Sequence, residues 1–170
     1  MSNQKNPGLS VIIITKNETA NIRDCLQSVV WADEIIVVDS GSTDNTVDIC
    51  REFTPHVHAR DWPGFGIQKN RALALATGDW VLSIDADERV TPELAAQIQA
   101  AMASGRAQAF EIPRLTRFCG QWIRHCGWTP DHVLRLFRRG TARFTDDLVH
   151  ERVLVDGPRP ARLTSPLLHE

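Results

Sequence analysis

Three short apolar segments rich in β-branched residues place the strongest constraint on the fold of this chain. They are Leu9–Thr15 (LSVIIIT), Glu34–Asp39 (EIIVVD) and Gly78–Ile84 (GDWVLSI), and each is followed by polar or acidic residues. None of them alternates apolar and polar residues, which is typical of strands covered on both faces in a parallel sheet. We therefore expect an α/β fold with a mixed, mainly parallel central sheet and helices on both faces.

Helices are expected between and after these strands. Apolar residues recur at helical spacing over about residues 22–30, 47–53, 67–76 and 92–105. Thr19 is the expected N-cap of the first of these helices. In the last, Thr91 precedes a proline at the first helical position and Gly105 ends the helix. A further strand is expected at His56–Ala59.

The pattern becomes less regular after Gly105. Strands are expected at Ala109–Ile112, Val133–Phe137 and Leu148–Val155, and the final residues, Leu167–Glu170, are expected to form an edge strand. The length of 170 residues fits one domain. The chain stops within the last expected strand, which suggests a truncation at the C-terminus.

Charge is distributed unevenly along a chain whose net charge is only -2. Residues 1–105 carry 8 Lys and Arg against 14 Asp and Glu, whereas residues 106–152 carry 9 against 5, and all nine cations are arginines. Arginine suits phosphate and carboxylate groups, so an anionic acceptor or an anionic membrane surface is one hypothesis, and a solvated basic face is the other. A nucleic-acid partner is disfavoured because the whole chain is slightly acidic.

The location expected from the sequence is cytoplasmic. No apolar run is long enough to span a bilayer, and the first eight residues are polar, unlike a signal peptide. The four cysteines form neither a dense disulfide framework nor paired Cys-x-x-Cys zinc spacing, which favours free thiols.

The segment Asp85-Ala86-Asp87 predicts a metal site. Side chains alternate along a strand, so Asp85 and Asp87 are expected to point the same way at the rim of the sheet, where ligands bind in open α/β folds. Mg²⁺ or Mn²⁺ would relieve the repulsion between the carboxylates and leave positions open for substrate phosphates. The alternative is a pair of solvated carboxylates that start the next helix. No glycine-rich phosphate loop follows the first strand, so dinucleotide and P-loop functions are disfavoured.

Four motifs in order resemble the signatures of family 2 glycosyltransferases. They are LSVIIITKNE (residues 9–18), IIVVDSGSTDNT (residues 35–46), QKNRALALATG (residues 68–78) and WVLSIDADE (residues 80–88). The resemblance implies a GT-A (Rossmann-like) fold and an inverting, metal-dependent transfer from a nucleotide sugar. Residues 1–105 would form the nucleotide-sugar-binding half and residues 106–170 the acceptor-binding half. The stretches at 131–139 and 149–151 are similar to bacterial lipopolysaccharide-core glucosyltransferases, which implies a UDP-sugar donor, a glycan or lipid-linked acceptor and peripheral contact with the inner membrane.

The resemblance also implies roles for individual residues at the nucleotide end of the site. Thr15 and Asp39 would hold the nucleoside, with the Asp39 carboxylate accepting from uracil N3–H. Asn17 belongs to the same motif as Thr15, and Glu18 would assist at the ribose or stabilise the loop. Arg71 would face the diphosphate.

At the other end of the site, the resemblance implies the residues around the donor sugar and the metal. Asp85, next to Ala86, would support the sugar or the ribose, while Asp87 and the C-terminal His169 would bind the metal. An inverting transfer also needs a carboxylate near the acceptor hydroxyl to take its proton, and both Glu151 and Asp131 are candidates. We favour Glu151 because an apolar pair precedes it and can fix it in place.

Two other functions remain open from the sequence. The chain could be a non-catalytic or truncated sugar-nucleotide-binding domain, which predicts UDP affinity without turnover. A sugar nucleotidyltransferase is the other alternative, but it requires a glycine-rich basic loop after the first strand, where this chain has Thr15–Glu18.

Overall fold

The computed structural model describes residues 8–124, 131–147 and 151–170. Within these residues ten strands form one sheet, whose main path runs β3-β2-β1-β4-β8-β6-β12-β5, with β7 and β11 attached to β6. The strands of this sheet are β1 (Leu9–Thr15), β2 (Glu34–Asp39), β3 (Val57–Ala59), β4 (Trp80–Ser83), β5 (Glu88–Val90), β6 (Ala109–Phe118), β7 (Gln121–Trp122), β8 (Asp131–Arg138), β11 (Ala161–Arg162) and β12 (Leu167–His169). Two more strands, β9 (Ala142–Phe144) and β10 (Val153–Val155), form a separate antiparallel pair.

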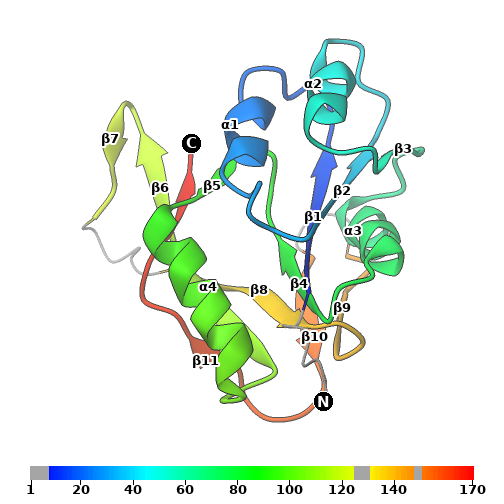
Figure 1. Cartoon of the computed structure of the whole chain (residues 1–170). Helices are drawn as coiled ribbons and strands as arrows, with labels where there is room; N and C mark the ends of the chain where they lie inside the picture. Colours follow the sequence, from blue (N-terminus) through cyan, green and yellow to red (C-terminus); the bar gives the residue numbers. More distant parts are fainter. Residues whose placement is uncertain (1–7, 125–130, 148–150) are drawn as a thin grey trace, which may run out of the picture.

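The sheet is mixed, as the sequence predicts. Strand β1 pairs in parallel with β2 and β4, and β2 pairs in parallel with β3. Strand β8 then lies antiparallel between β4 and β6, while β12 runs parallel to β6 and antiparallel to β5. The carboxyl ends of β1, β2 and β4 therefore meet at one edge of the sheet (Figure 1).

The helices cover both faces of the sheet, which confirms the expected layers. Helices α1 (Ile22–Gln27), α2 (Thr46–Phe53) and α4 (Pro92–Ser104) contribute buried residues to one hydrophobic cluster, together with β1 residues Val11 and Ile13. Helix α3 (Phe65–Leu75) packs on the other face, in a second cluster that contains Ile12 of β1 and Phe144 of β9. Successive residues of β1 thus face opposite layers, which explains why this strand has no polar alternation.

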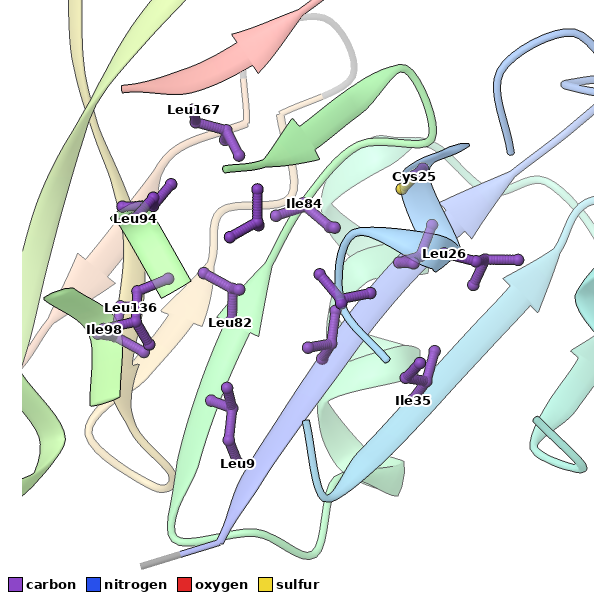
Figure 2. Packing of buried hydrophobic residues seen from close by; sticks show 14 of the residues in the cluster. Leu9, Cys25, Leu26, Ile35, Leu82, Ile84, Leu94, Ile98, Leu136 and Leu167 are labelled. Carbon is purple, nitrogen blue, oxygen red and sulfur yellow. The ribbon is translucent and has the colours of Figure 1, made fainter. Parts of the chain in front are cut away.

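Figure 2 shows the larger cluster from close by, with Leu9 and Leu82 on the strands and Leu94 and Ile98 on α4. These four side chains are at most 1% exposed. Full burial of a leucine or isoleucine side chain contributes about 1.5–3 kcal/mol relative to exposure, so this layer holds the strand ends that carry the site in fixed positions.

The helix ends agree with the sequence in one case and differ in another. Thr91 caps α4 by accepting a hydrogen bond from the Leu94 backbone N–H at 3.1 Å, and Gly105 ends the helix with φ of 65°. The expected cap by Thr19 is wrong, since α1 begins at Ile22 with Asn21 at the N-cap position and no side-chain cap. Helix α1 also ends three residues earlier than its apolar spacing predicts.

Later strands differ more from the expectation. Strand β6 extends to Phe118, whereas its apolar run suggests an end at Ile112. Strands β5, β7, β9 and β11 are not expected from the sequence, and the expected strand at 148–155 is described only from residue 151 onward, where β10 covers its last three residues. Both halves of the chain contribute strands to the same sheet, while the assignment of residues 1–105 and 106–170 to donor and acceptor remains a prediction.

Among the described residues, none of the helices combines the length and the apolar character that a membrane crossing requires.

Candidate active site

A cleft of about 460 Å³ opens at the carboxyl edge of the sheet. It is bordered by the ends of β1, β2 and β12, the turn after β4, the first turns of α3, and residue 151. Its lining residues are Ile14, Thr15, Lys16, Glu18, Ser40, Trp62, Phe65, Lys69, Asp85, Ala86, Asp87, Glu151 and His169. Residues far apart in the sequence therefore share one concave site, which is where ligands bind in open α/β sheets.

Thr15 and Glu18 lie on the β1 side of the cleft. Thr15 is 5% exposed, and its hydroxyl oxygen is buried without a hydrogen-bond partner among the described residues. A buried hydroxyl in this condition costs free energy unless a ligand or water satisfies it. Glu18 is held from two sides, because its backbone N–H donates to Thr46 Oγ1 at 2.8 Å and its carboxylate accepts from Asn21 Nδ2 at 3.2 Å.

Asp39 and Asn17 shape the edge of the sheet next to the cleft and do not line it. The Asp39 carboxylate is buried and accepts from the backbone N–H groups of Gly41 and Ser42 at 2.9 and 2.8 Å and from the Ser42 hydroxyl at 2.5 Å. Asn17 adopts a left-handed conformation, with φ of 53°, and its side-chain oxygen accepts from the Thr43 N–H at 2.8 Å. Both side chains therefore fix the loop after β2, which presents Ser40 to the cleft.

Lys69 lies between two carboxylates at the centre of the cleft. Its Nζ is 2.6 Å from Glu151 Oε1 and 3.1 Å from Asp85 Oδ1, and the lysine side chain is only 6% exposed. The ring of Phe144 lies beneath the ammonium group at 5.7 Å. A buried ammonium group is stable only with such partners, so Lys69 fixes the distance between the two acids.

Arg135 holds Asp85 from the opposite side. Its guanidinium donates to Asp85 Oδ2 at 3.1 Å and to Glu88 Oε1 at 2.8 Å, while Glu88 Oε2 accepts from the Asp85 backbone N–H at 2.8 Å. Burial disfavours the charged form of Asp85, but Arg135 and Lys69 outweigh it and hold the pKa of this carboxyl well below its usual range. Asp85 therefore stays ionised and fixed in direction.

The Asp85-Ala86-Asp87 segment lines the cleft from a turn and not from the end of a strand as expected. Strand β4 ends at Ser83, and these residues form a turn, so the side-chain alternation of a strand does not apply. Asp85 points to Lys69, whereas Asp87 Oδ2 contacts His169 Nε2 at 3.2 Å. Both carboxylates nevertheless line the same cleft.

Asp87 and His169 meet because β12 pairs with β5, which follows the turn directly. The hydrogen bond to Asp87 raises the pKa of His169. Among the described residues, no group of three or more His, Cys, Asp or Glu side chains is arranged to hold a metal on its own. The Asp87 carboxylate is nevertheless a ligand type that suits Mg²⁺ or Mn²⁺, because Mg²⁺ usually takes one or two carboxylates and completes its shell with water and substrate phosphates; the His169 imidazole beside it is a less usual ligand for these ions.

Arg71 lies outside the lining of the cleft. Its Nη1 donates to Oδ1 of the exposed Asp61 at 2.9 Å and to Oε1 of the buried Gln68 at 3.0 Å. Two residues along a helix differ by about 200° around its axis, so Lys69 and Arg71 cannot both face the cleft. Lys69 lines the cleft and Arg71 does not, so the expected contact of Arg71 with the diphosphate stays a prediction that this geometry does not favour.

The two candidate bases lie in different surroundings. Asp131, at the start of β8, is half exposed, forms a 2.7 Å ion pair with Arg114 and does not line the cleft. Glu151 lines the cleft and is joined to Asp85 through Lys69.

Gly66 brings the segment before Glu151 close to α3. A Cβ atom at this position would lie 1.7 Å from the carbonyl oxygen of Thr145, so only glycine permits this approach. The side chain of Asn70, one turn later, bonds both backbone groups of Phe144 at 2.9 Å.

The sequence assigns no site role to Arg135, Trp62, Phe65 or Gly66, and it places Lys69 only as one of several residues on α3 that could face the carboxyl edge of the sheet. Lys69 and Gly66 fall in or beside a motif that the sequence analysis quoted, and the helical period alone could have shown that Lys69 and Arg71 face different ways. Arg135 lies in an apolar strand pattern, and an arginine inside such a pattern requires a buried acidic partner.

The sequence model described as Glycosyl transferase family 2 matches residues 10–153. An uncharacterized glycosyltransferase of Rickettsia typhi is 36% identical over 144 residues, which cover 82% of this chain and 49% of the relative. The lipopolysaccharide core biosynthesis glycosyltransferase LpsC of Rhizobium meliloti is 32% identical over 173 residues, covering 95% of this chain and 62% of LpsC. This chain spans about half the length of the Rickettsia relatives that it matches.

Solved structures show the same fold. S. aureus TarS 1-349 aligns with a TM-score of 0.64 at 21% identity, over 83% of this chain and 51% of TarS. Glucosyl-3-phosphoglycerate synthase from Mycobacterium tuberculosis, in complex with Mn²⁺ and UDP-glucose, aligns with a TM-score of 0.54 at 28% identity, over 65% of this chain and 44% of the synthase. The likeness to these structures confirms the expected GT-A architecture.

Proposed function

Since this chain belongs to glycosyl transferase family 2, we propose that it transfers a hexosyl group, glucose in the first instance, from a UDP-sugar to a lipopolysaccharide-core heptose or a similar glycan. The observation that carries this proposal is the arrangement of Glu151, Lys69 and Asp85 beside Asp87 and His169 in one cleft. It combines a carboxylate that can act as a base with a separate pair of side chains that can hold a cation.

The nucleoside of the donor lies at the β1 and β2 ends of the cleft. The Thr15 hydroxyl, which has no hydrogen-bond partner among the described residues, supplies one hydrogen bond there, and Asp39 holds the loop that presents Ser40. Glu18 lines the same side, at the ribose. Uracil would be recognised by its N3–H donor, and the contact to Asp39 that the family resemblance implies requires the loop after β2 to give access to this buried carboxylate, which does not line the cleft.

Asp87 and His169 are the residues that would hold Mg²⁺ or Mn²⁺ in this cleft. Such a cation would supply positive charge to balance the negative charge that develops on the departing nucleotide. Asp85, ionised and fixed by Arg135 and Lys69, accepts hydrogen bonds from hydroxyl groups of the donor.

Glu151 acts as the general base. The acceptor hydroxyl attacks the anomeric carbon from the face opposite the nucleotide, its proton passes to the Glu151 carboxylate, and the bond between the anomeric carbon and the diphosphate breaks. The configuration at the anomeric carbon inverts. Lys69 keeps the base in place through its 2.6 Å contact to Glu151 Oε1.

The acceptor proposal is supported by the similarity to LpsC, a lipopolysaccharide core biosynthesis glycosyltransferase whose alignment covers 95% of this chain. The arginine-rich segment 106–152 supports an anionic acceptor. With a lipid-linked acceptor, the protein would work at the cytoplasmic face of the inner membrane through this basic segment.

Calorimetry and a transfer assay test the proposal in two steps. The protein should bind UDP in the presence of Mn²⁺ and more weakly after chelation, and it should release UDP from UDP-glucose faster when a core oligosaccharide is added. Absence of UDP binding with Mn²⁺ present would refute the donor assignment. Binding without transfer to any core acceptor would instead favour a non-catalytic sugar-nucleotide-binding domain.

A further inference from the structure

Two aromatic side chains that take no part in the carboxylate chemistry described above form part of the cleft wall. Trp62 and Phe65 are 44% and 43% exposed, although both are large apolar residues. Their ring centroids are 4.8 Å apart and the ring planes meet at 88°, an edge-to-face arrangement. Single exposed apolar residues need no explanation, but a paired set that lines a ligand cleft does.

The segment that carries this pair is fastened to the end of β2. The Arg60 backbone N–H donates to the Asp39 carbonyl at 2.9 Å, directly before the pair. After it, the buried Gln68 side chain donates to Ser40 Oγ at 2.9 Å. In the sheet order β3-β2-β1-β4, β1 lies between the end of β2, where this segment is fastened, and β4.

The part of the donor nucleotide at this end of the cleft is therefore the part farthest from the diphosphate. Thr15, at the end of β1, carries the buried hydroxyl that lacks a partner among the described residues, and it lines the same cleft. A nucleobase offers both a flat face, which an aromatic ring can stack on, and polar edges, which a buried hydroxyl can satisfy. A diphosphate has no flat face.

Resting on the proposed function, we propose that Trp62 and Phe65 form the stacking wall for the nucleobase of the donor nucleotide. In an edge-to-face pair one ring supports the other, so the ring that stacks on the base is braced by its neighbour. Both residues therefore affect affinity for the nucleoside part of the ligand, while the diphosphate part is held elsewhere.

Titration calorimetry with two ligands tests this proposal, using UDP and inorganic pyrophosphate, each with Mn²⁺. Stacking of a base on an aromatic ring contributes about 1–3 kcal/mol, so Trp62→Ala should weaken UDP binding about tenfold or more. Pyrophosphate binding should change less than about twofold, because no stacking energy is involved. Trp62→Phe should restore part of the UDP affinity.

Phe118→Ala is the matched control, since Phe118 is 67% exposed and lies outside the cleft. This variant should bind both ligands like the unchanged protein. Unaltered UDP affinity in Trp62→Ala would overturn the proposal, as would an equal loss of pyrophosphate affinity. If Trp62→Ala raised only the KM for the glycan acceptor, the pair would belong to the acceptor site and the proposal would be wrong. Failure of the unchanged protein to bind UDP would overturn the proposed function itself, so the two failures are distinguishable.

Discussion

Replacement of Lys69 by methionine is the perturbation that follows most directly from the geometry of the cleft. Methionine keeps most of the length of the side chain and removes the ammonium group. The change eliminates the 2.6 Å contact to Glu151 and the 3.1 Å contact to Asp85. Asp85 keeps its 3.1 Å partner Arg135, whereas the contact to Lys69 is the one ion pair found for Glu151 among the described residues. Glu151, the proposed base, should therefore lose its position, whereas Asp85 should largely keep its own.

The expected magnitudes follow from this difference. Misplacement of a catalytic group by about 1 Å can cost 10²-fold in rate, so kcat should fall about 100-fold, equivalent to about 2.7 kcal/mol in the barrier. Removing one partner of a fully buried ion pair costs about 3–5 kcal/mol of stability. The side chains of Asp85 and Glu151 are 34% and 18% exposed, so solvent offsets part of that cost. We expect a loss of about 1–2 kcal/mol in the free energy of unfolding.

The assay is steady-state release of UDP from UDP-glucose with a saturating core acceptor, after thermal unfolding has shown that the variant is folded. Arg71→Met, two residues further along α3, is the matched control because Arg71 pairs with the exposed Asp61 outside the cleft. It should retain kcat within about threefold, since surface ion pairs contribute little. A Lys69→Met variant with nearly full kcat, or an equal loss in Arg71→Met, would refute this reasoning.

Three further changes test other parts of the account. Gly66→Ala places a Cβ 1.7 Å from the Thr145 carbonyl oxygen, so it should lower the free energy of unfolding by about 1–3 kcal/mol, measured by urea denaturation, and unchanged stability would contradict the close approach. Asp87→Asn should weaken Mn²⁺-dependent UDP binding about tenfold or more in calorimetry, whereas UDP binding measured with chelator should be unaffected; equal losses in both would remove Asp87 from the cation site. Burial, together with the nearby Asp39 charge, raises the pKa of the Cys50 thiol to about 12. Iodoacetamide at pH 8 should therefore leave Cys50 unmodified in the folded protein and alkylate the exposed Cys119. Rapid labelling of both cysteines, detected by peptide mass spectrometry, would refute the burial of Cys50.

The sequence predicts the first half of the fold well because local patterns determine it. The runs at β1 and β2 are apolar without alternation, and burial on both faces of a parallel sheet is the arrangement that such runs favour. Thr91 and Gly105 mark the ends of α4 by capping chemistry that involves only neighbouring residues. These features require no knowledge of distant contacts.

The second half depends on pairing between segments that are far apart in the chain. Strand β5 has three residues and forms because β12, almost eighty residues later, pairs with it. Pairing of this kind is decided by packing against neighbouring strands, and local propensity does not encode it. The same pairing brings His169 to Asp87, a contact that only the family resemblance, and no local pattern, predicts.

Contacts between distant segments also decide how the charged residues of the site are arranged. The motif around Lys69 and Arg71 offers two cations, and their direction from α3 decides which one faces the cleft. Lys69 meets Glu151 across 82 residues of sequence, and Arg135 meets Asp85 across 50, so neither contact is visible in local spacing. The carboxylates that follow β4 are the informative signal in the sequence, and their ion-pair partners become visible only in the structure.

The most direct test of the central claim is the comparison of Glu151→Gln with Asp131→Asn in paired measurements of UDP binding and glycosyl transfer. Glutamine keeps the shape of Glu151 but cannot accept the acceptor's proton as a carboxylate does, and a general base contributes about 10²–10⁴-fold to rate. We predict that Glu151→Gln binds UDP with Mn²⁺ like the unchanged protein and loses at least about 100-fold in transfer. Asp131→Asn should retain transfer, since Asp131 pairs with Arg114 outside the cleft. Full transfer by Glu151→Gln, or loss of transfer by Asp131→Asn alone, would contradict the account.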